Sequence, residues 1–436
     1  MNRKNFLSTA TLFLISILFA CSPMASMDLV SPADAGYDAK KLNEIKDVLD
    51  PLYEDGRIPN YVVLLAKDEK IFYSAIRGNT NVNGGRPVDK ETAYMVASMT
   101  KPIVSAAVFS LIEEGKLSLD DTLNSFFPVF DDLFVAPGGS FDSAFEELER
   151  EITVLDLITH TSGFTYGESI IGLGDVAKQY DEIGVMSSER SLNENLEILS
   201  EVPLIAQPGT TFNYSIGLDL LAAIIEKIEG KRLGDILKER FFEPMDMKNI
   251  GFGKEDFSDG DNIAWLYGAP QNGVKPIGKI KDDGISWKFA GLPFAPQPGL
   301  NRQFDSGGGG LWSSAEDYLK FASLLGAKGL WKGERILGEE TVKKQTTNLV
   351  PGLGLKAFEA QFGNAASMMA FGGGLGIKKE SESTDAVDYY FWGGALNTSF
   401  WVDPIDGSAG VFLTHHFPGQ YNVNDELEQI IDDARF

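Results

Sequence analysis

A serine and a lysine stand one helical turn apart in VASMTKPIVSAAVFSLIEEGKL, residues 96–117. Positions i and i+3 of a helix share a face, so the ammonium group of Lys101 can reach the hydroxyl of Ser98. Pro102 lacks a backbone N–H and fits a helix only in its first turn, which places the helix start near Ser98. A serine hydroxyl becomes a nucleophile when a base takes its proton, and a buried lysine can be that base. The spacing therefore points to covalent catalysis, although Ser-x-x-Lys also arises by chance and serine is a common helix N-cap.

A tyrosine in QPGTTFNYSIG, residues 207–217, can complete the proton transfer. Tyr214 follows a Pro-Gly turn and precedes a predicted helix at 218–231. A phenol beside an ammonium group ionises more readily, so it can accept the proton of Ser98 and pass it to a leaving group. The alternative is a core tyrosine whose hydroxyl is satisfied by a neighbour.

A third segment, YYFWGGALNT at residues 389–398, reads as a strand with two adjacent glycines. Gly393 and Gly394 would let a substrate lie against the strand edge. A backbone N–H at its end can join that of Ser98 in an oxyanion hole, which stabilises the anion formed on the attacked carbonyl. The alternative is a β-bulge.

The elements that must position these residues are strands at both ends of the chain and helices between them. Residues 61–67 and 70–76 predict two strands, and residues 371–379, 388–394, 398–404 and 409–416 predict four more. Residues 424–436 predict a closing amphipathic helix with Asn424 as its cap. Short turns join the strands, so the sheet should be mostly antiparallel. The expected fold class is α+β, with a helical lobe inserted into a sheet built from both ends.

Composition excludes several other kinds of function. The net charge of −25 argues against nucleic acid or anionic lipid as a partner. Three histidines, His160, His415 and His416, are too few for a convincing imidazole metal site. His160 is expected to be structural within its turn, and at most one of the other two should face inward. No nucleophile elbow or phosphate-binding loop is present, and the four glycines 307–310 read as a turn where backbone passes closely.

The N-terminus reads as a targeting segment. Residues 6–20 are apolar and uncharged after Arg3 and Lys4, which is typical of a signal peptide and too short for a comfortable membrane span. Cys21, the single cysteine of the chain, follows at once. The run resembles a bacterial lipobox, which implies a lipidated Cys21, with an ordinary signal peptide as the alternative. The expected divisions are a signal peptide at 1–20, a lipidated tether at 21–36 and one domain at 37–436.

Taken together, these motifs resemble the serine β-lactamase and penicillin-binding protein superfamily. The segments SMTK at 98–101, Tyr-Ser at 214–215 and WGG at 392–394 occur in the right order. Further matching segments are LITHTSGFTYG (157–167), QPGTTFNYS (207–215) and GGGGLWSSAEDY (307–318). The likeness covers about residues 40–436 and is greatest to class C β-lactamase-like proteins, especially the family VIII carboxylesterases.

The resemblance implies a role for each motif. Ser98 would be the nucleophile, Lys101 its base partner and Tyr214 the proton shuttle. The backbone N–H groups of Ser98 and Ala395 would form the oxyanion hole. The resemblance also implies a β-lactamase-like fold with a sheet lobe at about 37–95 and 305–436 and a helical lobe at about 96–304.

Two departures from the superfamily pattern indicate an ester as the substrate. Class C β-lactamases and D,D-peptidases carry Tyr-x-Asn and Lys-Thr-Gly; here Ile216 and the run Trp392-Gly393-Gly394 stand instead. An isoleucine cannot hydrogen-bond an amide, and a tryptophan cannot attract a carboxylate by charge. Tyr166 and other aromatic residues near Trp392 can line an apolar acyl pocket, or they can be core packing.

The sequence therefore predicts a serine hydrolase that cleaves a small-molecule carboxylic ester through an acyl-enzyme, without a metal or organic cofactor. The alternatives are a β-lactamase, a D,D-peptidase or another amide hydrolase on the same site, and a lipoprotein that binds a ligand without turning it over. An exported protein is expected, anchored by lipid at the periplasmic face of the outer membrane or at the cell surface.

Overall fold

The computed structural model describes residues 26–82, 84–187, 189–268, 275–276, 303–350, 369–379, 387–417 and 423–436. The predicted signal peptide and Cys21 lie outside these ranges. Within them, every helix is too short or too polar to cross a membrane.

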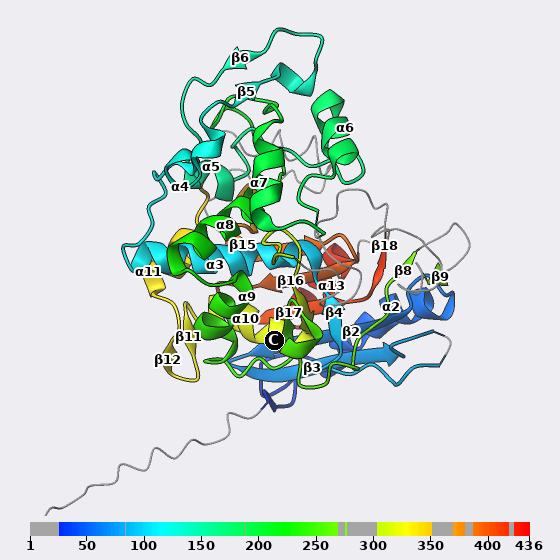
Figure 1. The fold of residues 1–436 in the computed structure, drawn as a ribbon. Helices are drawn as coiled ribbons and strands as arrows, with labels where there is room; N and C mark the ends of the chain where they lie inside the picture. Colours follow the sequence, from blue (N-terminus) through cyan, green and yellow to red (C-terminus); the bar gives the residue numbers. More distant parts are fainter. Residues whose placement is uncertain are drawn as a thin grey trace, which may run out of the picture.

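An eight-stranded sheet built from both ends of the chain forms the centre of the larger lobe (Figure 1). Its strand order is β1-β3-β2-β17-β16-β15-β14-β13, and every neighbouring pair is antiparallel except β1 with β3. The strands are β1 (Asp28–Leu29), β2 (Asn60–Lys67), β3 (Lys70–Gly78), β13 (Met369–Phe371), β14 (Gly376–Lys379), β15 (Val387–Gly394), β16 (Thr398–Val402) and β17 (Ala409–Leu413). The predicted α+β class and the mostly antiparallel sheet are confirmed.

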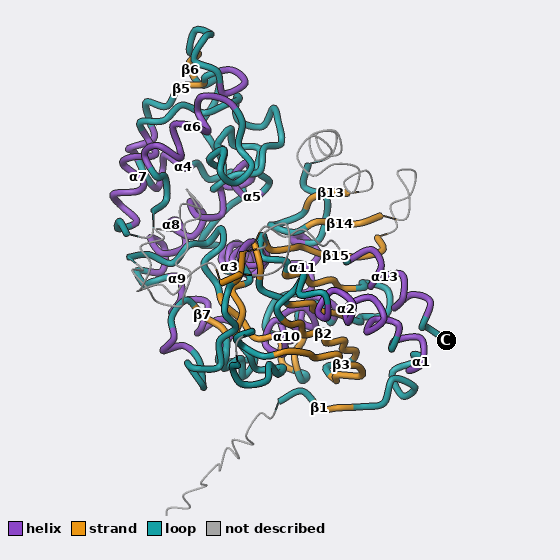
Figure 2. Tube along the Cα trace, turned by 90° about the vertical axis from the view of Figure 1, so that its right-hand side faces the viewer, coloured by secondary structure: helices purple, strands orange, loops and turns teal. Residues whose placement is uncertain are grey.

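Both faces of this sheet are covered by helices, as Figure 2 shows. Side chains alternate between the faces along a strand, so β2 contributes to two apolar cores. Val62, Leu64 and Ala66 face the larger core beside α3 (Thr100–Glu113) and α10 (Ala315–Gly326), while Tyr61, Val63 and Leu65 face the smaller one. The smaller core lies under α1 (Ala39–Leu42), α2 (Glu44–Glu54) and α13 (Asn424–Asp433).

The second lobe stands above the sheet in Figure 1 and consists mainly of short helices and loops. Its elements are α4 (Leu123–Phe126), β5 (Phe134–Val135), β6 (Glu146–Glu147), α5 (Val154–Ile158), α6 (Gly174–Ile183) and α7 (Leu192–Ser200). Helix α8 (Gly217–Glu229) contacts both α5 of this lobe and α3 of the sheet lobe. The buried side of α8 therefore ties the two lobes together along the line where the predicted catalytic residues lie.

The remaining elements are short and lie mostly in the sheet lobe. Two further sheets have three strands each: one has the order β4-β10-β7 and lies beside the start of α3, and the other has the order β18-β8-β9. The full set of remaining elements is β4 (Ala93–Met95), η1 (Ala97–Met99), η2 (Pro128–Phe130), η3 (Pro137–Gly139), α9 (Leu233–Leu237), η4 (Lys238–Phe242), β7 (Ile250–Gly251), η5 (Lys254–Asp256), β8 (Tyr267–Gly268), β9 (Lys275–Pro276), β10 (Trp312–Ser314), β11 (Leu330–Trp331), β12 (Glu334–Arg335), α11 (Glu339–Gln345) and β18 (His416–Phe417).

Three sequence expectations differ from the structure in detail. The strand expected over residues 371–379 is two strands, β13 and β14, which pair with each other across a turn of glycines. Asn424 does not cap α13: Val423 occupies the cap position, and the Asn424 side chain accepts a hydrogen bond from Ser399 Oγ at 2.7 Å. Strand β17 ends at Leu413, short of the two histidines that the expected strand 409–416 contained.

The described part of the expected tether, residues 26–36, lies against the sheet lobe. Asp28 and Leu29 pair with Lys70 and Ile71 at the edge of the sheet. The Met27 side chain is buried, and its backbone N–H donates to Glu316 Oε1 at 2.6 Å. Lys90 Nζ lies 2.7 Å from the other oxygen of that buried carboxylate. This segment is thus part of the folded domain.

Candidate active site

Ser98 lies in η1, a tight turn directly before α3. The residue before it, Ala97, has a φ of +46°. A left-handed backbone costs a non-glycine residue about 1–2 kcal/mol, and such strain gathers at functional sites where the surroundings enforce it. Ser98 stands at the N-terminal end of α3, where the helix dipole favours negative charge.

Hydrogen bonds from several elements hold this turn in place. Thr100 Oγ1 donates to Ala97 O at 2.7 Å and accepts from the backbone N–H of Leu311 at 3.0 Å. Tyr318 Oη on α10 donates to Met99 O at 2.7 Å. These hydrogen bonds fix the backbone around Ser98, as a preorganised nucleophile requires.

Lys101 is fully buried in the first turn of α3 and directs its ammonium group at Ser98. Its Nζ donates to Ser98 Oγ at 3.3 Å and to the carbonyl oxygen of Gly308 at 2.6 Å. It also lies 4.6 Å from the ring centroid of Tyr214 and 5.5 Å from that of Tyr166. The structure thus brings the predicted serine, lysine and tyrosine together in one place, with Tyr166 beside them.

The two tyrosines differ in their surroundings. Burial holds the pKa of Tyr166 well above its usual value, and ionised Tyr214 or Asp219 would raise it further. Tyr166 therefore remains a neutral phenol at neutral pH. Tyr214 is 6% exposed and precedes α8, with its ring 5.5 Å from that of Tyr166 and 5.8 Å from that of Trp392.

A buried carboxylate behind Lys101 was not predicted from the sequence. Asp219, in the first turn of α8, accepts hydrogen bonds from Ser306 Oγ at 2.6 Å and from the backbone N–H of Gly308 at 3.0 Å. The carbonyl of the same Gly308 receives the ammonium of Lys101, so Asp219 fixes the residue that holds the lysine. Burial raises the pKa of Asp219, while these hydrogen bonds and the charge of Lys101 oppose that rise. The sequence did contain a signal for this buried carboxylate: Asp219 is the single acidic residue within the otherwise apolar run 218–225.

The glycine turn at 307–310 has the close backbone approach that the sequence indicates. A Cβ atom on Gly308 would collide with the carboxylate of Asp219, and one on Gly307 would collide with the carbonyl of Leu218. A side chain at either position would separate this turn from α8. The turn can therefore deliver the Gly308 carbonyl to Lys101 only because these positions are glycine.

The segment expected to form the oxyanion hole adjoins η1. Ala395 follows the last residue of β15, and Gly394 packs so closely on Val96 that a Cβ atom there would strike the Val96 carbonyl. Thr398 Oγ1 donates to the same carbonyl at 3.3 Å. The end of β15 and the turn that carries Ser98 are thus neighbours, and Ala395 lies in the connection between β15 and β16.

The edge of β15 near this point extends beyond its partner on one side. Strand β14 pairs with β15 from Val387 to Phe391, and Trp392, Gly393 and Gly394 lie past that ladder. Gly393 is exposed and Gly394 is half-buried. This geometry fits the expected role of the two glycines as a surface along which a substrate can lie.

The two positions that replace the amide-recognition residues are apolar and buried. Ile216 is 2% exposed and occupies the cap position of α8, and Trp392 is 5% exposed. The Trp392 ring lies 5.4 Å from that of Phe371, an aromatic neighbour not singled out from the sequence. The surroundings of Tyr214 are therefore aromatic and aliphatic on these sides.

The three histidines are all fully buried. His160 bonds within its own turn through its backbone N–H, which donates to Leu157 O at 3.4 Å. Its ring bonds another segment instead: Nδ1 lies 3.2 Å from both the backbone N and the Oγ of Ser215. The expectation that at most one of His415 and His416 faces inward is wrong: both are buried, since β17 ends at Leu413 and His416 begins the separate strand β18. His415 Nδ1 contacts Ala264 O at 3.1 Å, and His416 Nε2 contacts Asn397 Nδ2 at 2.9 Å.

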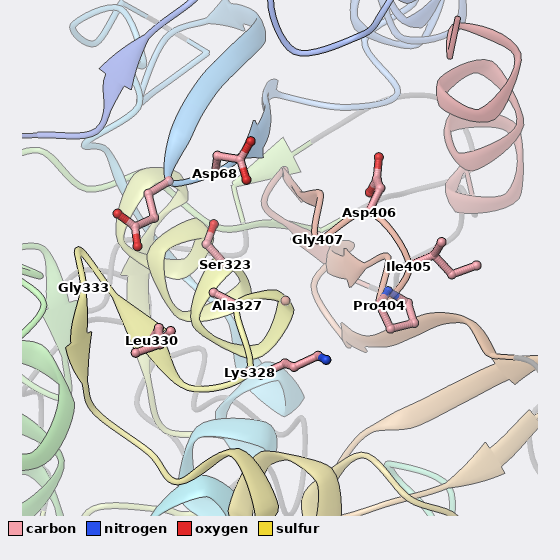
Figure 3. A pocket seen from close by; sticks show the side chains of 12 residues that line it. Asp68, Ser323, Ala327, Lys328, Leu330, Gly333, Pro404, Ile405, Asp406 and Gly407 are labelled. Atoms are coloured by element: carbon pink, nitrogen blue, oxygen red, sulfur yellow. The ribbon is translucent and has the colours of Figure 1, made fainter.

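A cavity of about 490 Å³ lies elsewhere, between the β2–β3 turn, the end of α10 and the β16–β17 turn (Figure 3). Its lining includes Asp68, Ser323, Lys328 and Asp406 and contains none of the predicted catalytic residues. It is therefore separate from the site at Ser98.

Comparison with known proteins finds a matching family model and relatives that cover most of the chain. The family model described as Beta-lactamase matches residues 45–433. The esterase EstB of Burkholderia gladioli is 28% identical over 410 residues, which cover 90% of this chain and 94% of EstB. The protein Rv1367c of Mycobacterium tuberculosis (strain ATCC 25618 / H37Rv) is 28% identical over 377 residues, covering 83% of this chain and 87% of Rv1367c.

Among solved structures, EstCE1, described as a hydrolase with promiscuous acyltransferase activity, superposes with a TM-score of 0.72 at 25% identity. The match covers 90% of this chain and 98% of EstCE1. A penicillin-binding protein from Bacillus halodurans shares the fold, with a TM-score of 0.62 at 21% identity over 88% of this chain and 99% of that protein.

Proposed function

Because the chain belongs to the beta-lactamase family, we propose that it is a serine hydrolase that cleaves a carboxylic ester through an acyl-enzyme on Ser98. The observation that carries this proposal is the contact of buried Lys101 with Ser98 Oγ at 3.3 Å, beside the ring of Tyr214. The likeness to EstB supports an ester as the substrate.

In the proposed reaction Ser98 Oγ attacks the ester carbonyl while its proton passes to Lys101, which starts as the neutral amine, and Tyr214 relays the proton toward the leaving group. The backbone N–H groups of Ser98 and Ala395 bind the oxyanion of the tetrahedral intermediate. The intermediate collapses as the C–O bond to the alcohol breaks, and Tyr214 protonates the leaving oxygen. Water then attacks the carbonyl of the acyl-enzyme. The bond to Ser98 Oγ breaks, the carboxylic acid leaves and the Ser98 hydroxyl is restored.

Asp219 and Tyr166 support this machinery without taking part in the bond changes. Asp219 holds the Gly308 peptide, whose carbonyl orients the ammonium of Lys101. Tyr166, as a neutral phenol, flanks the same ammonium with its ring. We assign Tyr166, Ile216, Trp392, Gly393 and Gly394 to the walls of the substrate site.

The ester preference rests on Ile216 and Trp392, so it is tested directly. We expect kcat/KM of the protein comprising residues 22–436 to be higher on p-nitrophenyl butyrate than on nitrocefin, by on the order of 10²-fold or more. The reason is that neither apolar side chain can pair with the amide or the carboxylate of a β-lactam. A preference for nitrocefin would instead establish the β-lactamase or amide-hydrolase alternative on the same nucleophile.

A second measurement separates a catalyst from a binding protein. A fluorophosphonate reacts with an activated serine, so covalent modification mapped to Ser98 by mass spectrometry supports catalysis. A protein that only binds an ester ligand has no activated serine and would remain unmodified.

We also propose that the protein is exported and anchored to a membrane through a lipid on Cys21. The apolar run 6–20 and the single cysteine directly after it support this. In a bacterial host, the wild-type protein should incorporate labelled palmitate and sediment with membranes. Cys21→Ser should lose the label, and equal labelling of both proteins would contradict the anchor.

A further inference from the structure

His160 holds the chain on both sides of Tyr214. Its carbonyl oxygen accepts from the backbone N–H of Asn213 at 2.7 Å. Its ring Nδ1 accepts from the backbone N–H of Ser215 at 3.2 Å. The rings of His160 and Tyr214 are tilted by 53° to each other, with centroids 4.6 Å apart. One residue thus binds the neighbour before Tyr214 and the neighbour after it.

These bonds matter because Tyr214 lies outside regular secondary structure. Residues 211–215 precede α8, whose first helical residue is Gly217, so no helical ladder fixes the backbone of Tyr214. A shift of about 1 Å in a reacting group can lower a rate by on the order of 10²-fold. The direction of the phenol toward Lys101 therefore depends on contacts such as those from His160.

The imidazole must be neutral to make the bond to Ser215. With Nδ1 accepting the Ser215 N–H, the neutral ring carries its proton on Nε2, a buried atom without a hydrogen-bond partner within the described residues. His160 is fully buried, and its ring lies 5.9 Å from that of Phe212 and 5.4 Å from that of Phe371. Burial and the nearby ammonium of Lys101 hold the pKa of His160 well below its usual range. The acceptor at Nδ1 is therefore present throughout the neutral pH range.

The backbone of His160 limits what can replace it. Its φ is +57°, a left-handed conformation that glycine adopts freely and asparagine tolerates well. Asparagine also carries an amide oxygen at about the place of Nδ1, whereas glycine carries no acceptor. These two substitutions separate the backbone requirement from the side-chain hydrogen bond.

We infer that His160 is a positioning residue for the proposed hydrolysis: its carbonyl and neutral imidazole fix the chain on either side of Tyr214 and so hold the phenol for proton transfer with Ser98. The inference rests on the proposed function and deepens it. His160 bonds Asn213 and Ser215 and transfers no proton itself.

The test compares His160→Asn with His160→Gly, each in the wild-type and in the Tyr214→Phe background. On p-nitrophenyl butyrate, His160→Asn should keep kcat within about 3-fold of wild type. His160→Gly should lower kcat by about 10–100-fold with little change in KM, a fraction of the 10²–10⁴-fold typical of acid–base catalysis. In the Tyr214→Phe background, His160→Gly should lower kcat by less than about a further 3-fold, because the effects of residues that act together are not additive.

Several outcomes would overturn the inference. An equal loss of kcat from His160→Gly with and without the Tyr214 hydroxyl would show a general structural role. Failure of a folded His160→Asn to retain activity would do the same. Thermal unfolding checks each variant, and His160→Ala, which also lacks the acceptor, replaces the glycine variant if that does not fold.

The rate at which a fluorophosphonate modifies Ser98 is measured on the same variants. This separates the two proposals: no ester turnover by the wild type contradicts the proposed function, while additive labelling rates contradict the role of His160. The inference is thus decided even if the natural substrate is not an ester.

Discussion

Ser98→Ala is expected to lower kcat on p-nitrophenyl butyrate by on the order of 10⁴-fold or more and to abolish fluorophosphonate labelling. The hydroxyl is the only group that forms the acyl-enzyme in the proposed reaction, and alanine offers no substitute. The fold should remain intact, because Thr100, Leu311 and Tyr318 hold the turn through groups other than the Ser98 side chain. The comparison is made by steady-state kinetics and by thermal unfolding of both proteins.

Ser105→Ala provides a matched control on the same helix. Ser105 is also buried on α3, four residues after Lys101, and its hydroxyl makes no hydrogen bond within the described part of the chain. Removing it should leave kcat nearly unchanged. A Ser98→Ala protein that keeps more than a few per cent of wild-type activity would refute Ser98 as the nucleophile.

The second large effect is expected at Lys101. Lys101→Met and Lys101→Arg should each lower kcat by about 10²–10⁴-fold, the range for loss of a general base. Arginine keeps the positive charge but does not give up its proton in a protein, so it cannot act as a base. Equal losses of kcat in the two variants therefore identify Lys101 as a proton acceptor. Full activity of Lys101→Arg would show instead that Lys101 contributes only its positive charge. Both are followed by kcat and by the rate of Ser98 labelling.

Lys320→Met is the control for removal of a buried lysine. Lys320 on α10 is 4% exposed and bonds Asp317 Oδ1 at 2.8 Å and Asp246 O at 2.5 Å, without contact to the catalytic residues. Its loss leaves the buried carboxylate of Asp317 without its ion-pair partner, with the backbone N–H of Asn249 still donating to it, so the melting temperature should fall. The kcat of the folded fraction should stay close to wild type. A comparable loss of kcat would mean that the Lys101 effect reports stability alone.

The sequence predicted the parts of the site that depend on local spacing. Ser98 and Lys101 share a helical face because they are three residues apart. Pro102 indicated a helix start within two residues of the observed start of α3. Tyr214 was predicted to lie just before a helix, and α8 begins three residues after it. The antiparallel sheet followed from short connections between apolar runs.

The parts that the sequence missed depend on contacts between distant segments. Asp219 meets Gly308 and Ser306 only after α8 packs on the glycine turn, nearly ninety residues away along the chain. His160 was assigned to its own turn, whereas its ring reaches Ser215. A local pattern carries no information about which buried polar group will satisfy another across the fold.

The packing of residues 26–30 has a consequence for solubility. Strand β3 would otherwise end the sheet, and unpaired N–H and C=O groups at a sheet edge are a template for strands of other molecules. Asp28 and Leu29 cover that edge at Lys70 and Ile71, and the Val30 N–H donates to Ile71 O at 3.0 Å. A shortened chain beginning at residue 37 would lose this cover together with the Met27 bond to Glu316. Residues 28–30 thus occupy part of a sheet edge that strands of other molecules could otherwise pair with.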